Sequence, residues 1–186
     1  MSHRGLKFGI FLAPFHRVGE NPTLSMDRDM ELIQWLDHLG YDEVWVGEHH
    51  SAGWETIASP EIFIGAAAER TRHISAGLGR HQPALSPPSD GRQPLRPARP
   101  HDPRARHAGL RARALPSDAY MMGIEPVTQR PCMEEALEAI MRLLRCDEPV
   151  TMKTDWFELR EARLHLAPYT DPHFPSRWRA PSRRPA

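Results

Sequence analysis

Strands and helices alternate along the first 80 residues, and this order constrains the fold more than any other feature of the sequence. Three short runs, Leu6–Leu12, Val44–Gly47 and His73–Leu78, have the apolar, β-rich character of buried strands. Helical segments separate them, beginning at Ser25 and Ser59. A β-α-β-α-β order requires parallel strands joined by right-handed crossovers. The sequence therefore predicts the α/β class with a parallel sheet.

Both helices have recognisable ends. We expect Ser25 to cap the first helix and Gly40 to follow its last turn, where glycine readily adopts a left-handed conformation. Ser59 and Pro60 are typical of a helix start, and Glu61 complements the helix dipole. The apolar residues of the first helix recur at helical spacing and predict a buried face: Met26, Met30, Ile33 and Leu36.

The second half of the chain predicts a further helix and a hairpin. Thr128 can cap a helix whose apolar stripe we interpret as core: Met133, Leu137, Ile140 and Leu144. Two strand-like runs, Thr154–Leu159 and Ala162–Leu166, suggest a hairpin that turns at Arg160 and Glu161.

Bulk properties exclude several classes of protein. The 186 residues suffice for one sizeable domain, and a net charge of zero gives no global signal for nucleic acid. Cys132 and Cys146 form no metal-ligand pattern or disulfide framework. The sequence shows neither a signal peptide nor a run long enough to span a membrane, so we expect a cytoplasmic protein without a membrane partner.

Two stretches differ sharply in composition from the rest. Residues 80–113 hold eight Arg and seven Pro, and residues 176–186 add four Arg and two Pro. Neither stretch has helical or strand periodicity, and proline interrupts both kinds of hydrogen-bond ladder. We therefore expect four parts: barrel-like β/α units in 1–79, an irregular segment in 80–113, a helix and hairpin region in 114–175, and an irregular tail in 176–186.

Two interpretations of these stretches stay open. One is a disordered Pro/Arg linker that meets nucleic acid or a partner domain. The other is translation in the wrong frame of a GC-rich gene. Codons for residues 80–88 exist whose shifted frame encodes VISLPYHH, a β-branched run followed by a polar turn. Sequencing the parent gene decides between them, because an uninterrupted frame near Gly79 and Pro175 rules out the second interpretation.

The strongest chemical signal is Glu48-His49-His50, which follows the Val44–Gly47 strand directly. In parallel α/β folds, ligands bind at the carboxyl ends of the strands. An imidazole beside a carboxylate suits proton transfer near neutral pH. The alternative is a polar loop with solvated histidines. A metal site is disfavoured, because adjacent histidines rarely give tetrahedral geometry and the sequence shows no third ligand.

Several motifs resemble one enzyme family. Lys7–Phe11, Gly40–His50 and Trp156–Leu159 resemble the bacterial luciferase-like flavin-dependent monooxygenases. Ala13–His16, Ser51–Glu55 and Ala114–Tyr120 look most like the limonene monooxygenase-like subgroup. The resemblance implies an eight-stranded (β/α)8 TIM barrel, of which this chain would be an incomplete form.

The same resemblance implies a chemistry. Reduced FMN, or FAD, would come from a separate flavin reductase and react with O2 at C4a, and one oxygen atom would enter a small apolar substrate. His49 matches the family's catalytic histidine, with Glu48 and His50 beside the cofactor. The aromatic residues Phe11, Phe15 and Trp54, together with Trp45, suit an apolar substrate pocket. The alternative is that they belong to the core. Intact family members often form homo-oligomers.

The sequence also departs from the family pattern. A barrel of this class needs about 250 residues, and the family's third strand and phosphate-binding loop would lie in or beyond the two odd stretches. We therefore expect a truncated chain that binds flavin weakly and is doubtful as an active enzyme. Two alternatives are a flavin- or deazaflavin-dependent barrel oxidoreductase without oxygen insertion, and a non-catalytic fragment with an Arg/Pro-rich binding segment.

Overall fold

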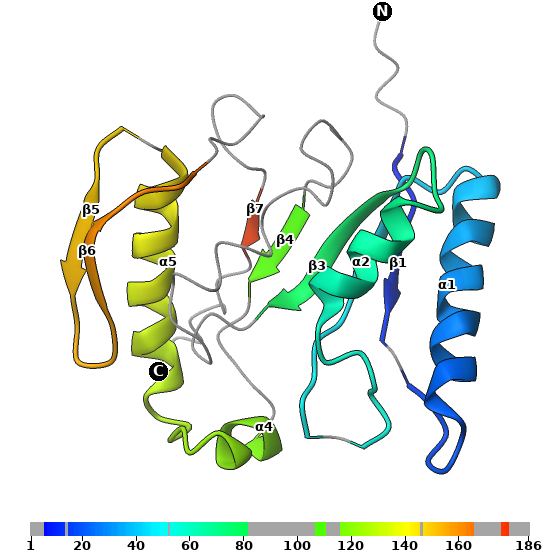
Figure 1. Ribbon diagram of the computed structural model, residues 1–186, viewed down its shortest axis with the longest axis horizontal. Coiled ribbons are helices and arrows are strands. Elements are labelled where there is room, and N and C mark those ends of the chain that lie inside the picture. Colours follow the sequence, from blue (N-terminus) through cyan, green and yellow to red (C-terminus); the bar gives the residue numbers. More distant parts are fainter. Residues whose placement is uncertain are drawn as a thin grey trace, which may run out of the picture.

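The computed structural model describes residues 6–13, 15–51, 53–81, 107–110, 116–145, 147–165 and 176–178. Their strands form a five-stranded parallel sheet in the order β1-β2-β3-β4-β7 and a two-stranded hairpin (Figure 1). The strands of the sheet are β1 (Gly9–Leu12), β2 (Glu43–Val46), β3 (Ser75–His81), β4 (His107–Leu110) and β7 (Ser176–Trp178). The predicted parallel sheet is confirmed.

The strand order is informative because it follows chain order without reversal. Each strand pairs with the next described strand of the sheet, from β1 with β2 to β4 with β7. A doubly wound sheet reverses direction at a switch point, whereas a barrel adds each strand beside the previous one. The described sheet therefore has the progression of an incomplete β/α barrel.

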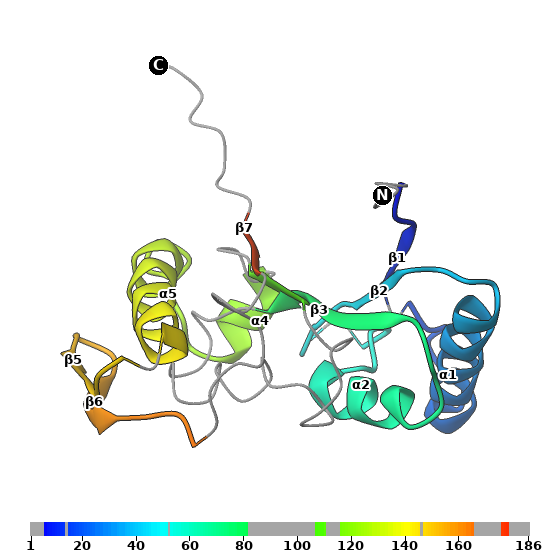
Figure 2. The ribbon, with the colours of Figure 1, turned by 90° about the horizontal axis from the view of Figure 1, so that it is seen from above.

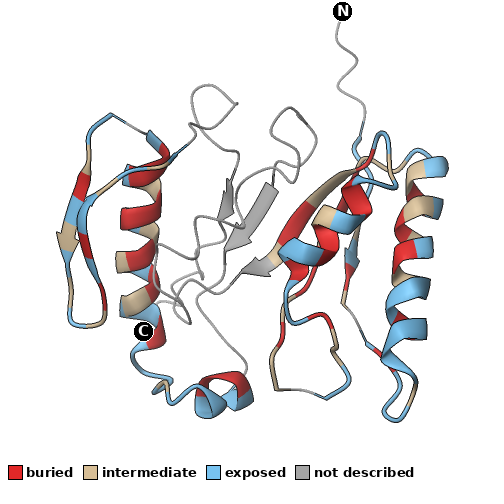
Figure 3. Cartoon of the chain, viewed as in Figure 1, coloured by how far each residue is buried: buried red, intermediate tan, exposed pale blue. Residues whose placement is uncertain are grey.

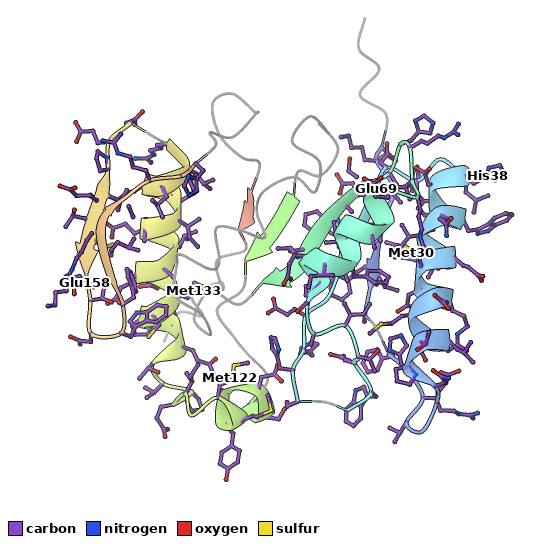
Figure 4. All side chains as sticks on the ribbon, viewed as in Figure 1. Met30, His38, Glu69, Met122, Met133 and Glu158 are labelled. Atoms are coloured by element: carbon purple, nitrogen blue, oxygen red, sulfur yellow. The ribbon has the colours of Figure 1, made fainter. Side chains whose placement is uncertain are left out.

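Helices α1 (Pro22–His38) and α2 (Pro60–Ala68) cover the same face of β1–β3 (Figure 2). Their buried residues face the strands in Figure 3, and Met30, labelled in Figure 4, lies on the side of α1 toward the sheet. Val44 and Val46 of β2 are fully buried beneath them. Alternate residues of β2 thus anchor the helices, as expected for a strand with helices on its outer face.

The predicted helix ends are partly confirmed. Gly40 follows α1 with φ +78, as expected, and α2 begins at Pro60. The cap of α1 was predicted wrongly: the helix begins at Pro22, and Asn21 accepts a hydrogen bond from the backbone of Thr23. Ser25 lies inside the first turn, buried, where its hydroxyl bonds to Glu20. An Asn-Pro pair is the stronger start signal, since proline suits the first helical position.

The third helix is confirmed, whereas the hairpin turn was placed wrongly. Helix α5 (Gln129–Arg145) begins directly after Thr128. Strands β5 (Val150–Lys153) and β6 (Glu158–Ala162) pair antiparallel, and the turn lies at 154–157 instead of 160–161. The Thr154 hydroxyl accepts hydrogen bonds from the backbone N–H groups of Trp156 and Phe157. Threonine side chains commonly form such local hydrogen bonds to the backbone in turns. Ala139, Leu143, Val150, Phe157 and Leu159 form the core between α5 and the hairpin.

The two Pro/Arg-rich stretches, expected to be irregular, contribute strand residues. Strand β3 continues through residues 80 and 81, and β4 and β7 fall within the two stretches. Parallel ladders use backbone groups, and none of these strand segments contains proline, which would interrupt the ladder. The other residues of 80–113 and 176–186 lie outside those described. Within the described part of the chain, no helix combines the length and apolarity needed to cross a bilayer.

Asp37, in the last turn of α1, holds the segment that enters β3. Its carboxylate accepts backbone hydrogen bonds from Arg72 (2.8 Å), His73 (2.7 Å) and Ile74 (2.6 Å). Burial opposes ionisation, yet these donors and the neighbouring His73 ring hold the pKa of Asp37 below its usual range. One carboxylate thus fixes the start of the strand whose far end reaches the site described below.

We expect Asp37→Ala to lower the free energy of unfolding by about 1–3 kcal/mol, because three backbone donors lose a charged acceptor. Since the pKa of Asp37 is lowered in the folded state, its contribution is present above the ordinary aspartate value of about 3.9 and is lost as pH falls through the lowered value. Urea unfolding at several pH values measures this. The control is Asp27→Ala, which removes an exposed carboxylate from the same helix; equal losses in both variants would contradict the assignment.

Candidate active site

Two loops meet at the carboxyl ends of β1 and β2. The backbone N–H of His16 donates to the carbonyl of Trp54 (2.6 Å), and Phe15 forms an isolated antiparallel bridge with Glu55. The loop after β1 and the loop after β2 are therefore joined. Helix α4 (Pro116–Met121) lies beside this pair of loops and supplies a buried side chain to it (Figure 1).

His49 lies at the centre of this arrangement, at the position predicted from the sequence. Its side chain is nearly buried, and both ring nitrogens face carboxylates. Nδ1 is 3.3 Å from Oδ2 of Asp118, and Nε2 is 3.1 Å from Oε2 of Glu55. The imidazole is therefore held between α4 and the loop after β2, with 10% of its side-chain surface exposed.

Asp118 is the anchor of the site. It is fully buried and accepts hydrogen bonds from the backbone of His50 (3.2 Å) and from the backbone (2.9 Å) and hydroxyl (2.5 Å) of Ser51. Burial opposes ionisation, but these donors and the ring of His49 outweigh it, so the pKa of Asp118 lies below its usual range. An ionised Asp118 requires the hydrogen of His49 to lie on Nδ1, which fixes the orientation of the ring.

Glu48 and His50 form a separate pair. Nε2 of His50 lies 2.9 Å from Oε1 of Glu48, and both side chains are partly buried. The hydrogen bond with Glu48 raises the pKa of His50, although burial acts in the opposite direction. The pair flanks His49 on the same loop, so it adds a carboxylate and a second imidazole to the site.

Replacing Glu48 by glutamine is expected to lower the pKa of His50, because the acceptor loses its charge. A raised folded-state pKa means that the pair stabilises the fold below the ordinary imidazole value of about 6.5, while Glu48 is still ionised. That contribution is lost as pH rises through the raised value. Histidine ring titration by NMR measures the shift, with Glu20→Gln, which removes a carboxylate paired with Arg28, as control. An unmoved His50 titration would contradict the pairing.

His16 is a third imidazole in the joined loops. Its Nδ1 lies 2.5 Å from the hydroxyl of Thr56, and its Nε2 lies 2.8 Å from Asp29 of α1. The ring is buried with both nitrogens bonded, which suits a structural role. His16 thus ties the loops after β1 and β2 to α1 and fixes the frame in which His49 lies.

The three aromatic residues predicted for a pocket are all partly exposed. Phe15 and Trp54 belong to the joined loops, and Phe11 stands on β1, with 70%, 47% and 43% of their surfaces exposed. A Cβ at Gly79 of β3 would overlap the Phe11 ring. The Phe11 ring therefore extends across β2 into space that a side chain at position 79 would fill.

Asp118 and Glu55 are the site residues that the sequence did not predict. Both occur in motifs noted for their resemblance, Ala114–Tyr120 and Ser51–Glu55, but nothing local assigns them a role. Asp118 is 69 residues from His49 in the chain, so only the fold brings the two together. Among the described residues, no group of three or more His, Cys, Asp or Glu side chains is arranged to hold a metal ion.

Comparison with known proteins gives a consistent picture. Residues 6–90 match the family described as luciferase-like monooxygenase. The chain is 48% identical over 176 residues to 4-hydroxyprotoasukamycin monooxygenase from Streptomyces nodosus subsp. asukaensis, covering 88% of this chain and 44% of that protein. It is 45% identical over 170 residues to limonene 1,2-monooxygenase from Rhodococcus erythropolis, covering 88% and 42%. The chain thus spans less than half the length of these two relatives.

A solved structure shares the fold. The oxygenating constituent of 3,6-diketocamphane monooxygenase from Pseudomonas putida, a type II Baeyer-Villiger monooxygenase in complex with FMN, superposes with a TM-score of 0.74. It is 24% identical in sequence and covers 82% of this chain and 42% of that one. At this identity the match establishes the incomplete barrel fold.

Proposed function

Because this chain belongs to the luciferase-like monooxygenase family, we propose that its site serves the oxygenation of a small apolar organic substrate by O2 and reduced flavin. The observation that carries the proposal is His49, buried at the carboxyl end of β2 with a carboxylate at each ring nitrogen. The two curated relatives named above are monooxygenases, and the structural neighbour from Pseudomonas putida holds FMN. We infer that FMN, or FAD, is the cofactor and that a separate reductase supplies it in the reduced form.

The residues present fit the ring of a flavin. The flat Phe11 ring fills the space that Gly79 leaves open, and it is itself partly exposed near the carboxyl end of β1. A flat apolar surface with one buried proton-carrying group next to it suits a planar heteroaromatic ring. Phe11 would contact the ring, and Glu48 and His50 would lie beside it.

Reduced flavin, when bound, supplies the electrons that activate O2. The chain's own part is to hold and move a proton: Asp118 keeps the hydrogen on Nδ1 of His49, which leaves Nε2 as the atom that exchanges a proton. The near-complete burial of His49 keeps water from that proton. Phe15 and Trp54 offer partly exposed apolar surface for a substrate such as a terpene.

The predicted division of the chain is part of the proposal. Residues 1–79 supply the loops after β1 and β2, and 114–175 supply Asp118 together with α5 and the hairpin. Residues 80–113 and 176–186 would be out-of-frame sequence. An uninterrupted parent gene would refute this last point and leave the role of His49 untouched.

A chimera tests the function directly. Residues 6–81 replace the matching segment of the limonene monooxygenase from Rhodococcus erythropolis, which supplies the rest of the barrel. With reduced FMN and O2, the chimera is expected to oxygenate limonene. A chimera that folds and binds FMN but forms no oxygenated product would overturn the proposal.

A further inference from the structure

Glu55 is placed against His49 by backbone as well as by side-chain contacts. The backbone of Glu55 forms the antiparallel bridge with Phe15, and this bridge fixes the backbone where the two loops join. Its side chain is only 6% exposed, and its Oε2 lies 3.1 Å from Nε2 of His49. The carboxylate is thus built into the site and does not reach it from solvent.

The surroundings of this oxygen are unusual. Among the described residues, Glu55 Oε2 is buried without a hydrogen-bond partner, although Nε2 of His49 lies within ion-pair distance. A buried carboxylate oxygen with no donor is costly, so native proteins rarely leave one unsatisfied. A slight rotation of the imidazole or of the carboxylate would align the two atoms, because their separation is already that of a hydrogen bond.

The neighbouring charges limit where the hydrogens can be. Asp118, with three donors besides His49, faces Nδ1 and holds a hydrogen there. Glu48 is already paired with His50. What remains among the described residues is the contact between Nε2 of His49 and Oε2 of Glu55, two atoms that repel each other unless a hydrogen lies between them.

We propose that Glu55 is a positioning residue that shares one proton with Nε2 of His49. In one form the glutamic acid donates O–H to the ring nitrogen, and in the other the imidazolium donates N–H to the carboxylate. Passing from the first form to the second breaks one O–H bond and forms one N–H bond, and no other reactant is needed. Asp118 fixes the far side of the ring.

The consequence for chemistry rests on the proposed function. If Nε2 is the atom that exchanges a proton during oxygenation, Glu55 keeps that atom supplied with a proton while the site is closed to water. Glu55 acts through His49 and does not touch the reacting atoms. The pairing itself is a property of this chain and can be measured without flavin.

Nitrogen NMR of the ¹⁵N-histidine-labelled 186-residue chain tests the pairing, with His49→Gln used to assign the ring signals. In Glu55→Gln, the Nε2 signal of His49 is expected to move toward the position of an unprotonated ring nitrogen, while the Nδ1 signal stays that of a protonated one. The matched control is Asp29→Asn, which removes the carboxylate partner of His16 and should change only the His16 ring.

An unmoved His49 Nε2 signal in a folded Glu55→Gln chain would overturn the proposal. Should that variant fail to fold, Glu55→Asp gives the same test: the shorter carboxylate should shift the Nε2 signal part of the way, and an unchanged signal would overturn it. The outcomes also separate the two proposals. A chimera that oxygenates limonene with an unmoved signal defeats only the role of Glu55, whereas an inactive chimera with a moved signal defeats only the oxygenase function.

Discussion

Replacing His49 by glutamine in the limonene monooxygenase chimera is expected to reduce oxygenation by about 10²–10⁴-fold, the usual contribution of a positioned acid-base group. Glutamine approximates the size and polarity of the ring but cannot carry a proton at neutral pH. Glu55 would still find a polar partner, so the loop after β2 should stay in place. The loss is expected in kcat as well as in kcat/KM, because the proton is needed in the reaction itself.

The control for this experiment is His38→Gln. His38 is an exposed histidine in the last turn of α1, and in Figure 4 it lies far from Met122, which follows α4. Steady-state product formation, measured with a fixed supply of reduced FMN, should be unchanged in this variant. Activity of the His49→Gln chimera within a few-fold of the parent would show that the imidazole has no part in proton transfer.

Replacing Asp118 by alanine is expected to lower the free energy of unfolding by about 3–5 kcal/mol, the cost of breaking a buried charged network. Asp118 is fully buried, and its removal leaves the backbone N–H groups of His50 and Ser51 and the Ser51 hydroxyl without their acceptor. His49 also loses the group that fixes Nδ1. Urea unfolding of the parent and the variant measures the difference.

The pH dependence of this loss has a defined sign. Because the pKa of Asp118 is lowered in the folded state, its stabilisation is present above the ordinary aspartate range and is lost as pH falls through the lowered value. The two unfolding curves should therefore converge in acid. The control is Asp147→Ala, which removes an exposed carboxylate after α5. A loss below about 1 kcal/mol at neutral pH would contradict the anchoring role, since surface substitutions fall in that range.

The framework of the fold could be predicted because its signals are local. The apolar Val44–Val46 run, the Ser59-Pro60 helix start and the glycine at position 40 each act on neighbouring residues, and together they yield the parallel order. The position of His49 at a strand's carboxyl end followed from the same reasoning. The sequence predicted helix ends less well where two local signals compete. Ser25 was predicted as the cap, but the earlier Asn21-Pro22 pair begins the helix.

The partners of His49 could not be predicted for a physical reason. Asp118 is brought to the histidine by the packing of α4 against the loops, across a separation of 69 residues. Glu55 is closer to His49 in sequence, but the direction of its side chain depends on the bridge with Phe15, which belongs to the loop after β1. The sequence instead pointed to Glu48 and His50, which the structure joins to each other.

The central claim is that residues 6–81 carry the working half of a flavin monooxygenase site centred on His49. The most direct test is the yield of oxygenated limonene from the chimera per molecule of reduced FMN consumed in the presence of O2. The account predicts product from the chimera and its near-complete loss on His49→Gln. A folded chimera that oxidises reduced FMN without transferring oxygen to limonene, with or without His49, would contradict it.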